Sequence, residues 1–251
     1  MAIHFKCSPL DLDQEQILDY LHILKSQHKT PSDSFFKHTV YGLRYAYRIS
    51  GMKEMCVVLP SIERPKKLPV VLSHNEVKQL LRAPKLLKHR LVLAMLYGCG
   101  LRNFELCNLQ LKDLDLERMM LHIRQGKGRK DRYVPLCAMQ VRGLKKYISA
   151  ESPVTWCFNG NDSKGHPVAL STTGVGWIVR EARKHSGIQK EVTTHSLRHS
   201  YATHLLEMGL DIMSVKDLLG HADIQTTLTY LHVARSGRQR PFSPLERLYN
   251  L

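Results

Sequence analysis

Apolar residues recur at helical spacing through the first fifty positions of the chain. The pattern predicts one helix within residues 10–24 and a second over about 33–48, separated by a turn at Pro31. Gly51 is expected to end the second helix. Residues 1–56 are therefore predicted to form a small helical domain.

Residues 57–70 interrupt this pattern. The stretch contains three prolines and four charged side chains, which favours an extended linker over a packed element. Its basic residues Lys66 and Lys67 are candidate contacts to a phosphate backbone, although a solvated linker is the more common explanation of such a run. The linker separates the first domain from a second domain, residues 71–251.

The second domain has a mainly helical pattern. A capping box at Ser73–Glu76 starts one helix, and the strongly apolar segment 86–97 predicts a buried one. Two strands are predicted at 119–124 and 132–136, joined by a basic hairpin tip. A loop near 158–168 is also predicted, with helices at 103–109, 138–149, 171–186, 196–208, 211–219 and 224–233. The expected fold is mainly α-helical with one small antiparallel sheet.

Composition and charge favour a soluble protein that binds a polyanion. The 251 residues carry a net charge of +15, and 43% of them are apolar. Residues 1–72 hold 10 basic and 7 acidic side chains, so the rest hold 27 and 15, a net +12. Clustered Lys and Arg favour polyanions because phosphate contacts release counterions. No apolar run approaches the ~20 residues of a membrane span, and the N-terminus lacks a signal-peptide pattern, so we expect a cytoplasmic protein without membrane contact.

Four chemically active side chains stand in the last sixty residues. His195 and Arg198 are three residues apart at a predicted helix start, so they share one face beside the positive end of the helix dipole. His221 follows Gly220, which is predicted to end a helix, and Tyr230 comes nine residues later. Two imidazoles, a guanidinium and a phenol suit attack on a phosphodiester without a metal. A lone tyrosine at this spacing is more often a packing residue, so the hypothesis depends on the whole set.

Zinc binding is the alternative use of these histidines. His195 and His199 are four apart on a predicted helix, and His204 follows. No acidic residue stands between the first two as in H-E-x-x-H, and Arg198 would repel the ion. The six cysteines are scattered, without a C-x-x-C pair. No metal site is therefore predicted, and His199 and His204 are interpreted as ordinary helix residues.

Several ordered motifs within residues 73–248 resemble those of the tyrosine recombinases, which include phage integrases, Xer-type resolvases and integron integrases. The matched segments are Y-G-C-G-L-R-N-F-E-L at 97–106, G-K-G-R-K-D-R at 126–132, H-S-L-R-H at 195–199, L-L-G-H at 218–221, and Tyr230. The resemblance implies a catalytic domain of the DNA breaking–rejoining type in residues 71–251. It also implies a DNA-clamping role for residues 1–56, which are shorter than the family's usual core-binding domain.

The resemblance also implies the roles of the main catalytic residues. Arg102 and Arg198 would clamp the scissile phosphate, because a guanidinium donates paired hydrogen bonds and keeps its charge. Tyr230 would be the nucleophile that forms a 3′-phosphotyrosyl intermediate. Lys127, at the hairpin tip, would protonate the leaving 5′ oxygen.

The remaining site residues are implied in the same way. His195 would assist proton transfer at the tyrosine, and His221 would hydrogen-bond the phosphate. Glu105 would support the site from behind. Arg129, Lys130 and Arg132, on and beside the hairpin tip, are candidate DNA contacts together with the linker lysines.

The predicted function is site-specific recombination of double-stranded DNA by a homotetramer on two duplexes. No cofactor, metal or ATP is expected, because arginines and lysine supply the positive charge and no G-x-x-x-x-G-K-[ST] loop occurs. The alternatives are a type IB topoisomerase-like relaxase and a non-catalytic DNA-binding factor derived from a recombinase. The tail, residues 234–251, is expected to dock on a neighbouring protomer, or else to fold onto its own domain.

Overall fold

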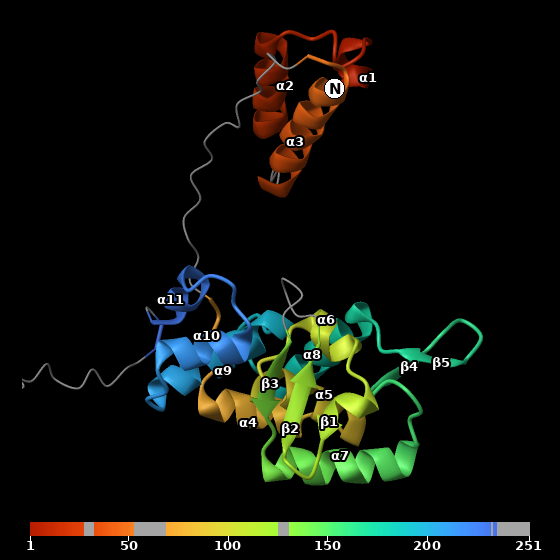
Figure 1. Cartoon of the computed structure of the whole chain (residues 1–251), viewed down its shortest axis with the longest axis vertical. Helices are drawn as coiled ribbons and strands as arrows, with labels where there is room; N and C mark the ends of the chain where they lie inside the picture. Colours follow the sequence, from red (N-terminus) through yellow and green to blue (C-terminus); the bar gives the residue numbers. More distant parts are fainter. Residues whose placement is uncertain (28–32, 53–68, 125–130, 232, 235–251) are drawn as a thin grey trace, which may run out of the picture. The chain divides into compact units, whose positions relative to one another are not determined.

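The chain forms two compact units in the computed structural model (Figure 1). The first spans Met1–Lys66 and the second spans Lys67–Leu251, so the division falls inside the predicted linker. The structure describes residues 1–27, 33–52, 69–124, 131–231 and 233–234. Most of the predicted linker, and the tail beyond Ala234, lie outside the described residues.

The first unit is helical in its described part, with α1 (Ala2–Phe5), α2 (Gln14–Gln27) and α3 (Asp33–Ile49). Asp13 starts α2, since its carboxylate accepts from the Gln16 backbone N–H at 2.8 Å while the Gln16 side chain accepts from the Asp13 N–H at 3.1 Å. The buried core consists of Leu12, Ile17, Leu21, Val40, Leu43 and Tyr47. The two longer helices match the predicted ones, whereas α1 is too short to give a periodic signal.

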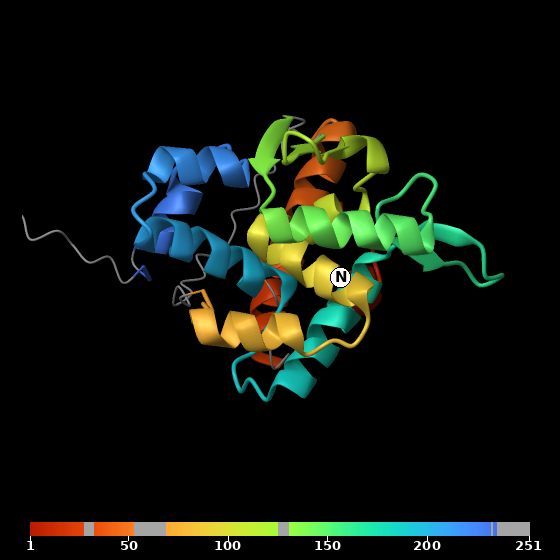
Figure 2. The ribbon, with the colours of Figure 1, turned by 90° about the horizontal axis from the view of Figure 1, so that it is seen from below.

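Helix α5 lies at the centre of the second unit, where α4, α6, α7, α8 and α9 contact it (Figure 2). The helices are α4 (His74–Arg82), α5 (Leu87–Gly98), α6 (Asn103–Cys107), α7 (Ala138–Glu151), α8 (Thr172–Ser186), α9 (Thr194–Glu207), α10 (Ile212–Leu219) and α11 (Gln225–Leu231). Buried side chains from α5 include Leu93, Met95 and Leu96, as its apolar sequence predicts. In the described part of the chain, no helix has both the length and the apolar content to cross a membrane.

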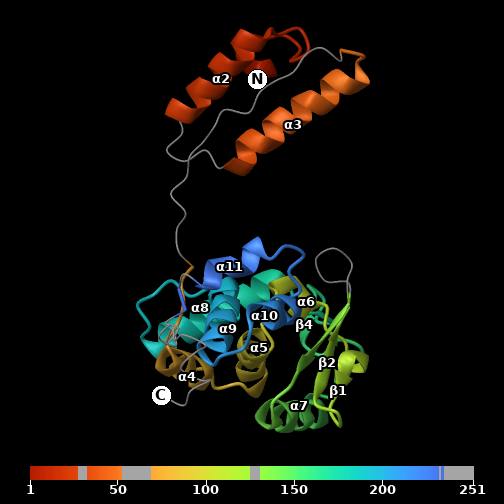
Figure 3. The same ribbon diagram turned by 60° about the vertical axis from the view of Figure 1, so that its left-hand side comes forward.

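The predicted hairpin forms the main sheet (Figure 3). Strand β2 (Met120–Ile123) pairs antiparallel with β3 (Arg132–Pro135), and β1 (Leu114–Asp115) pairs with the other edge of β2. Leu121 pairs with Val134, so their side chains lie on the same face of the sheet. Both are fully buried. The hairpin tip, residues 125–130, lies outside the described residues.

A second small sheet differs from the prediction of a single sheet and a loop at 158–168. Strand β4 (Asn159–Asn161) pairs antiparallel with β5 (Pro167–Ala169). Asp162 closes the hairpin, because its carboxylate accepts from the Lys164 and His166 backbone N–H groups at 2.8 Å. Each strand has three residues, which is too short for an alternating pattern to be recognised.

Caps fix the ends of the helices that carry the predicted site residues. Thr193 caps α9, because its hydroxyl accepts from the Ser196 N–H at 3.2 Å, so the helix begins two residues before the predicted start. Asp211 caps α10 through the N–H groups of its first turn. Gly220 ends α10 with a positive φ of 61°, as predicted from the sequence.

Candidate active site

The Glu105 side chain is buried at the centre of a group of arginines. Its two carboxylate oxygens accept from Arg132 Nη1 at 2.9 Å and Nη2 at 2.8 Å, a bidentate pair. Arg102 donates to the same carboxylate from its backbone N at 2.8 Å and from Nη1 at 2.7 Å. Arg198 Nη1 lies 3.9 Å from Glu105 Oε2. One carboxylate therefore joins the start of α6, strand β3 and helix α9; we call these four residues the arginine cluster.

Backbone carbonyls at the end of α10 orient the same guanidinium groups. The last carbonyls of a helix lack intrahelical partners and carry the negative end of the helix dipole, so they accept readily from cations. The hydrogen bonds run from Arg132 Nε to Leu218 O (2.9 Å), from Arg198 Nη2 to Leu219 O (2.6 Å) and from Arg102 Nη2 to Gly220 O (3.1 Å). The end of α10 thus sets the direction of all three arginines.

Burial and charge set the protonation states of the arginine cluster. Burial alone would raise the pKa of Glu105, but the hydrogen bonds and charge of Arg132, together with the hydrogen bonds of Arg102, lower it from 4.5 to about 2. Burial, followed by the charge of Arg102, lowers the pKa of Arg198 to about 10, which leaves it protonated at neutral pH. Three guanidinium groups therefore face one carboxylate, and the excess positive charge suits a phosphate.

Tyr230 lies buried beside two histidines. Its side chain belongs to α11 and is 3% exposed, and its Oη lies 3.0 Å from His199 Nδ1. The His221 ring stacks against the phenol, with centroids 6.2 Å apart and planes at 17°. His221 is held in turn through its Nδ1, which lies 2.9 Å from Thr227 Oγ1. The nucleophile predicted from the sequence is therefore packed against one imidazole and hydrogen-bonded to another.

The pKa shifts make this contact a neutral pair. Burial, with the charges of His195 and Arg198, lowers the pKa of His199 to about 4, so its ring is uncharged at neutral pH. Burial raises the pKa of Tyr230, although the charges of Arg198 and Arg102 act in the opposite direction. A protonated phenol and a neutral imidazole therefore share this hydrogen bond.

Comparisons with known proteins decide the family. The sequence model of the phage integrase family matches residues 70–236. This chain belongs to the phage integrase family. The tyrosine recombinase XerA of Thermococcus kodakarensis is 36% identical over 226 residues, which cover 89% of this chain and 78% of the relative. A tyrosine recombinase of Thermosipho africanus is 37% identical over 227 residues, which cover 89% of this chain and 75% of the relative.

Solved structures share the fold of this integrase-family chain. The crystal structure of XerA recombinase matches with a TM-score of 0.64 and 28% identity, over 96% of this chain and 88% of that one. XerH recombinase in a post-cleavage complex with its difH substrate matches with a TM-score of 0.70, over 97% of this chain and 73% of that one. At 23% identity, this match shows a shared fold only. The predicted family, the mainly α-helical fold with an antiparallel sheet, and the enzyme class of tyrosine recombinase are confirmed.

The described site residues predicted for this tyrosine recombinase lie in two groups, with His195 apart from both. Arg102, Glu105 and Arg198 lie in the arginine cluster, and His221 and Tyr230 lie against each other. His195 is exposed on α9, with its ring centroid 6.2 Å from that of His199. Outside the described residues lie Lys127, Arg129, Lys130, Lys66 and Lys67.

Arg132, a predicted DNA contact, lies in the arginine cluster. Its side chain is 8% exposed and forms the bidentate pair with Glu105. The register explains this placement, because Arg132 pairs with Ile123 and shares the inner face of β3 with Val134. The structure thus gives Arg132 a supporting contact to Glu105, and its role in DNA binding stays a prediction.

His199 is the site residue that sequence reasoning missed. It lies one helical turn after His195 and directly after Arg198, and it contacts the phenol of Tyr230. Its spacing from His195 could have identified it, because residues four apart on a helix share a face. Two histidines on one face were therefore both candidates for the contact with the tyrosine.

We expect Gly220→Ala to be more destabilising than an ordinary substitution at a helix end. A positive φ costs an L-residue about 1–2 kcal/mol, and a Cβ at Gly220 would lie 2.9 Å from Arg132 Nη1. Gly187→Ala is the matched control, because Gly187 ends α8 with φ 73° and has open space around its Cβ position. Denaturant unfolding should show a larger loss of stability for Gly220→Ala than for Gly187→Ala. Equal losses would mean that a Cβ at position 220 does not crowd the Arg132 side chain.

Proposed function

We propose that this tyrosine recombinase is a site-specific DNA recombinase that cuts and rejoins one strand per active site through a 3′-phosphotyrosyl intermediate. The observation that carries the proposal is that Tyr230 on α11 contacts α9 at His199, the residue that follows Arg198. The charges of Arg198 and Arg102 also act to lower the pKa of its phenol, against the effect of burial. A nucleophile beside two guanidinium groups is suited to attack on a phosphodiester, where negative charge develops on the non-bridging oxygens.

The proposed reaction balances without a cofactor. The bond from Tyr230 Oη to phosphorus forms as the bond from phosphorus to the 5′ oxygen breaks. His195 assists removal of the phenol proton, and Lys127 gives a proton to the leaving oxygen. Arg102, Arg198 and His221 hold the phosphate throughout. Because the phosphotyrosine retains the energy of the broken bond, a free 5′ hydroxyl can reverse the reaction without ATP or a metal ion.

Burial implies an order of events at this site. The Arg102 side chain is 20% exposed, whereas those of Arg198 and Tyr230 are 4% and 3% exposed. A phosphate from solvent therefore meets Arg102 first. The phenol has to leave its contact with His199 before in-line attack, so we infer that α11 shifts when DNA binds.

Double-stranded DNA is the proposed partner, bound by a homotetramer that holds two duplexes. The net charge of +15 supports a polyanionic partner. Two similar proteins, XerH recombinase and the Tn1549 transposon integrase, are solved in complexes with DNA. Arg129, Lys130, Lys66 and Lys67 are proposed as contacts to the DNA backbone.

The test is to trap the protein on genomic DNA of its source organism and to map the cut sites by sequencing. A 3′-phosphotyrosyl bond leaves a peptide on the 3′ end after proteolysis, which blocks a 3′ exonuclease, and a 5′ hydroxyl that polynucleotide kinase labels directly. The adduct should form without added Mg²⁺ or ATP. A peptide on the 5′ end, or no adduct, would refute the mechanism. Two labelled duplexes should exchange strands, whereas relaxation without exchange would favour a topoisomerase.

We expect His195→Ala to slow cleavage and His199→Ala not to slow it. The phenol leaves its contact with His199 before attack, so loss of this hydrogen bond of about 1 kcal/mol should leave the rate unchanged or raise it by roughly 10-fold or less. Loss of a residue that assists proton transfer costs about 10²–10⁴-fold, which we expect for His195→Ala. Single-turnover cleavage of a nicked substrate measures both rates. A larger loss for His199→Ala would identify His199 as the proton acceptor instead.

A further inference from the structure

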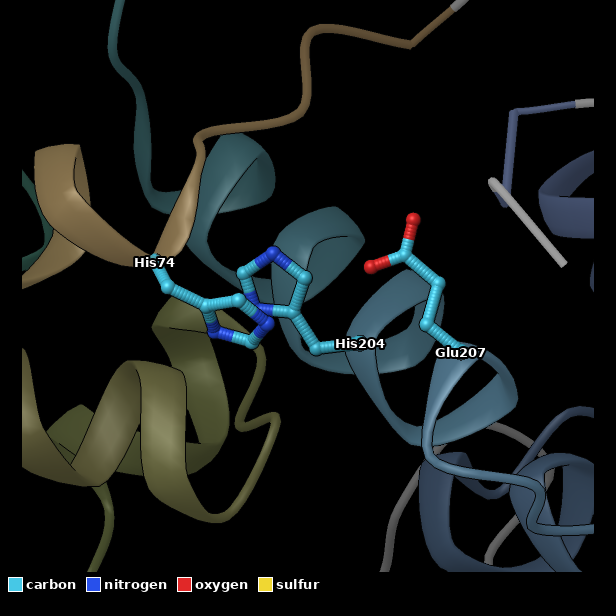
Figure 4. A group of neighbouring side chains, drawn as sticks. All are labelled: His74, His204 and Glu207. Carbon is cyan, nitrogen blue, oxygen red and sulfur yellow. The ribbon is translucent and has the colours of Figure 1, made fainter. Parts of the chain in front are cut away.

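Two histidines and a glutamate converge where the chain enters the second unit (Figure 4). His74 is the first residue of α4, and His204 and Glu207 stand three apart in the last turns of α9. One potential ligand atom from each side chain lies within 4.8 Å of the other two. The two imidazole rings overlap with centroids 4.0 Å apart, and the Glu207 carboxylate faces the His204 ring. Helical spacing puts His204 and Glu207 on one face, and His74 completes the group from another helix.

His204 already has the kind of partner that orients a metal-binding imidazole. Its side chain is buried, with 5% exposure, and its Nδ1 lies 2.9 Å from the Tyr97 hydroxyl. A ligating histidine typically uses one ring nitrogen for the metal while a hydrogen bond at the other fixes the ring. Because Tyr97 contacts Nδ1, an ion would bind Nε2, in place of the hydrogen bond between this ring and the Leu72 backbone.

The surroundings leave room for an ion and its water. An open cavity of about 540 Å³ is lined by the three side chains together with residues 71–73, Lys190 and Val233. The charge of Lys190 is directed elsewhere, because its Nζ donates to Glu76 Oε2 at 2.7 Å and to the Val71 carbonyl at 3.1 Å. Segments far apart in the sequence thus meet at one polar cavity.

We propose that Zn²⁺ binds to His74, His204 and Glu207, with water in the fourth position. Zinc takes imidazole nitrogen and carboxylate oxygen ligands at about 2.0–2.2 Å in a tetrahedral arrangement. His74 is exposed and can rotate to close the remaining distance. The ion fastens the entry of the chain to α9, the helix that also carries Arg198 and His199. The site is separate from the arginine cluster and Tyr230, so it does not depend on the proposed reaction.

The test is a titration of the full chain, stripped of metal and kept reduced, with ZnCl₂. Calorimetry should show one saturable site per chain, and the unfolding temperature should rise with zinc, because an ion that binds the folded state stabilises it. His74→Ala should weaken zinc binding by more than about 10-fold, since loss of an outer partner alone costs about 10–100-fold. MgCl₂ should produce neither effect.

The matched control is His185→Ala. His185 is an exposed histidine that also lies one helical turn from a glutamate, Glu181, so it tests whether any such pair accounts for the binding. We expect His185→Ala to bind zinc as the unaltered chain does, and Tyr97→Phe to weaken binding by about 10-fold with all ligands present. The proposal is overturned if the unaltered chain shows no saturable site. It is also overturned if His74→Ala binds zinc equally well, or if both histidine variants lose binding to the same extent.

Discussion

Replacing Tyr230 by Phe should abolish covalent adducts with DNA while leaving DNA binding nearly unchanged. The hydroxyl is the only atom group that differs, and the Phe ring fills the same buried space against His221. Stability should fall by about 1 kcal/mol, because His199 Nδ1 loses its hydrogen-bond partner inside the protein. Adducts are measured on a nicked suicide substrate by denaturing gel electrophoresis, and binding by mobility shift.

The matched control for this result is Tyr201→Phe. Tyr201 is a buried tyrosine of α9 that packs in the same apolar cluster as Tyr230, and it has no assigned role in the reaction. We expect the control to form adducts at the rate of the unaltered chain. Adducts that persist in Tyr230→Phe would place the nucleophile on another side chain, and adducts lost in both variants would point to a packing defect.

The helices were predictable because their signals are local. The capping box before α4, the apolar run of α5 and the glycine that ends α10 each act within a few residues, and the structure contains all three features. Strands β4 and β5 gave no such signal, because their pairing depends on the Asp162 turn rather than on alternation. Local chemistry was thus sufficient for the long elements and insufficient for the shortest ones.

The candidate site was predictable in its residue types, and its contacts were not. The ordered motifs identified Arg102, Glu105, Arg198 and Tyr230, but no sequence pattern relates Glu105 to the inner face of β3, where Arg132 pairs with it. The contacts of the α9 histidines depend on which element packs against each turn. Tertiary packing, which a single sequence does not encode locally, decides these pairings.

Replacing Glu105 by Gln should cause the largest loss of stability among these substitutions. The carboxylate pairs with Arg102 and Arg132 and lies near Arg198, so its neutralisation leaves buried guanidinium groups without a counter-charge. Removing one partner of a buried ion pair costs about 3–5 kcal/mol. The fall in the pKa of Glu105 from 4.5 to about 2 corresponds to about 3 kcal/mol, which agrees with that range. Cleavage should fall as well, because the guanidinium of Arg102 loses the charged partner that helps to orient it.

The same carboxylate predicts how stability depends on pH. Because folding lowers the pKa of Glu105, its contribution is fully present above about pH 4.5 and is lost as the pH falls towards 2. As the pH falls from about 4.5 to 2, Glu105→Gln should therefore lose less stability than the unaltered chain, as measured by denaturant unfolding.

Asp113→Asn is the control for the effect of Glu105→Gln on cleavage, since Asp113 is a buried carboxylate paired with Arg124 outside the arginine cluster. Asp113→Asn should reduce stability without slowing cleavage by the folded protein. If it slows cleavage as much as Glu105→Gln does, the slower cleavage of both variants reflects general instability rather than an effect on the arginines that face the phosphate.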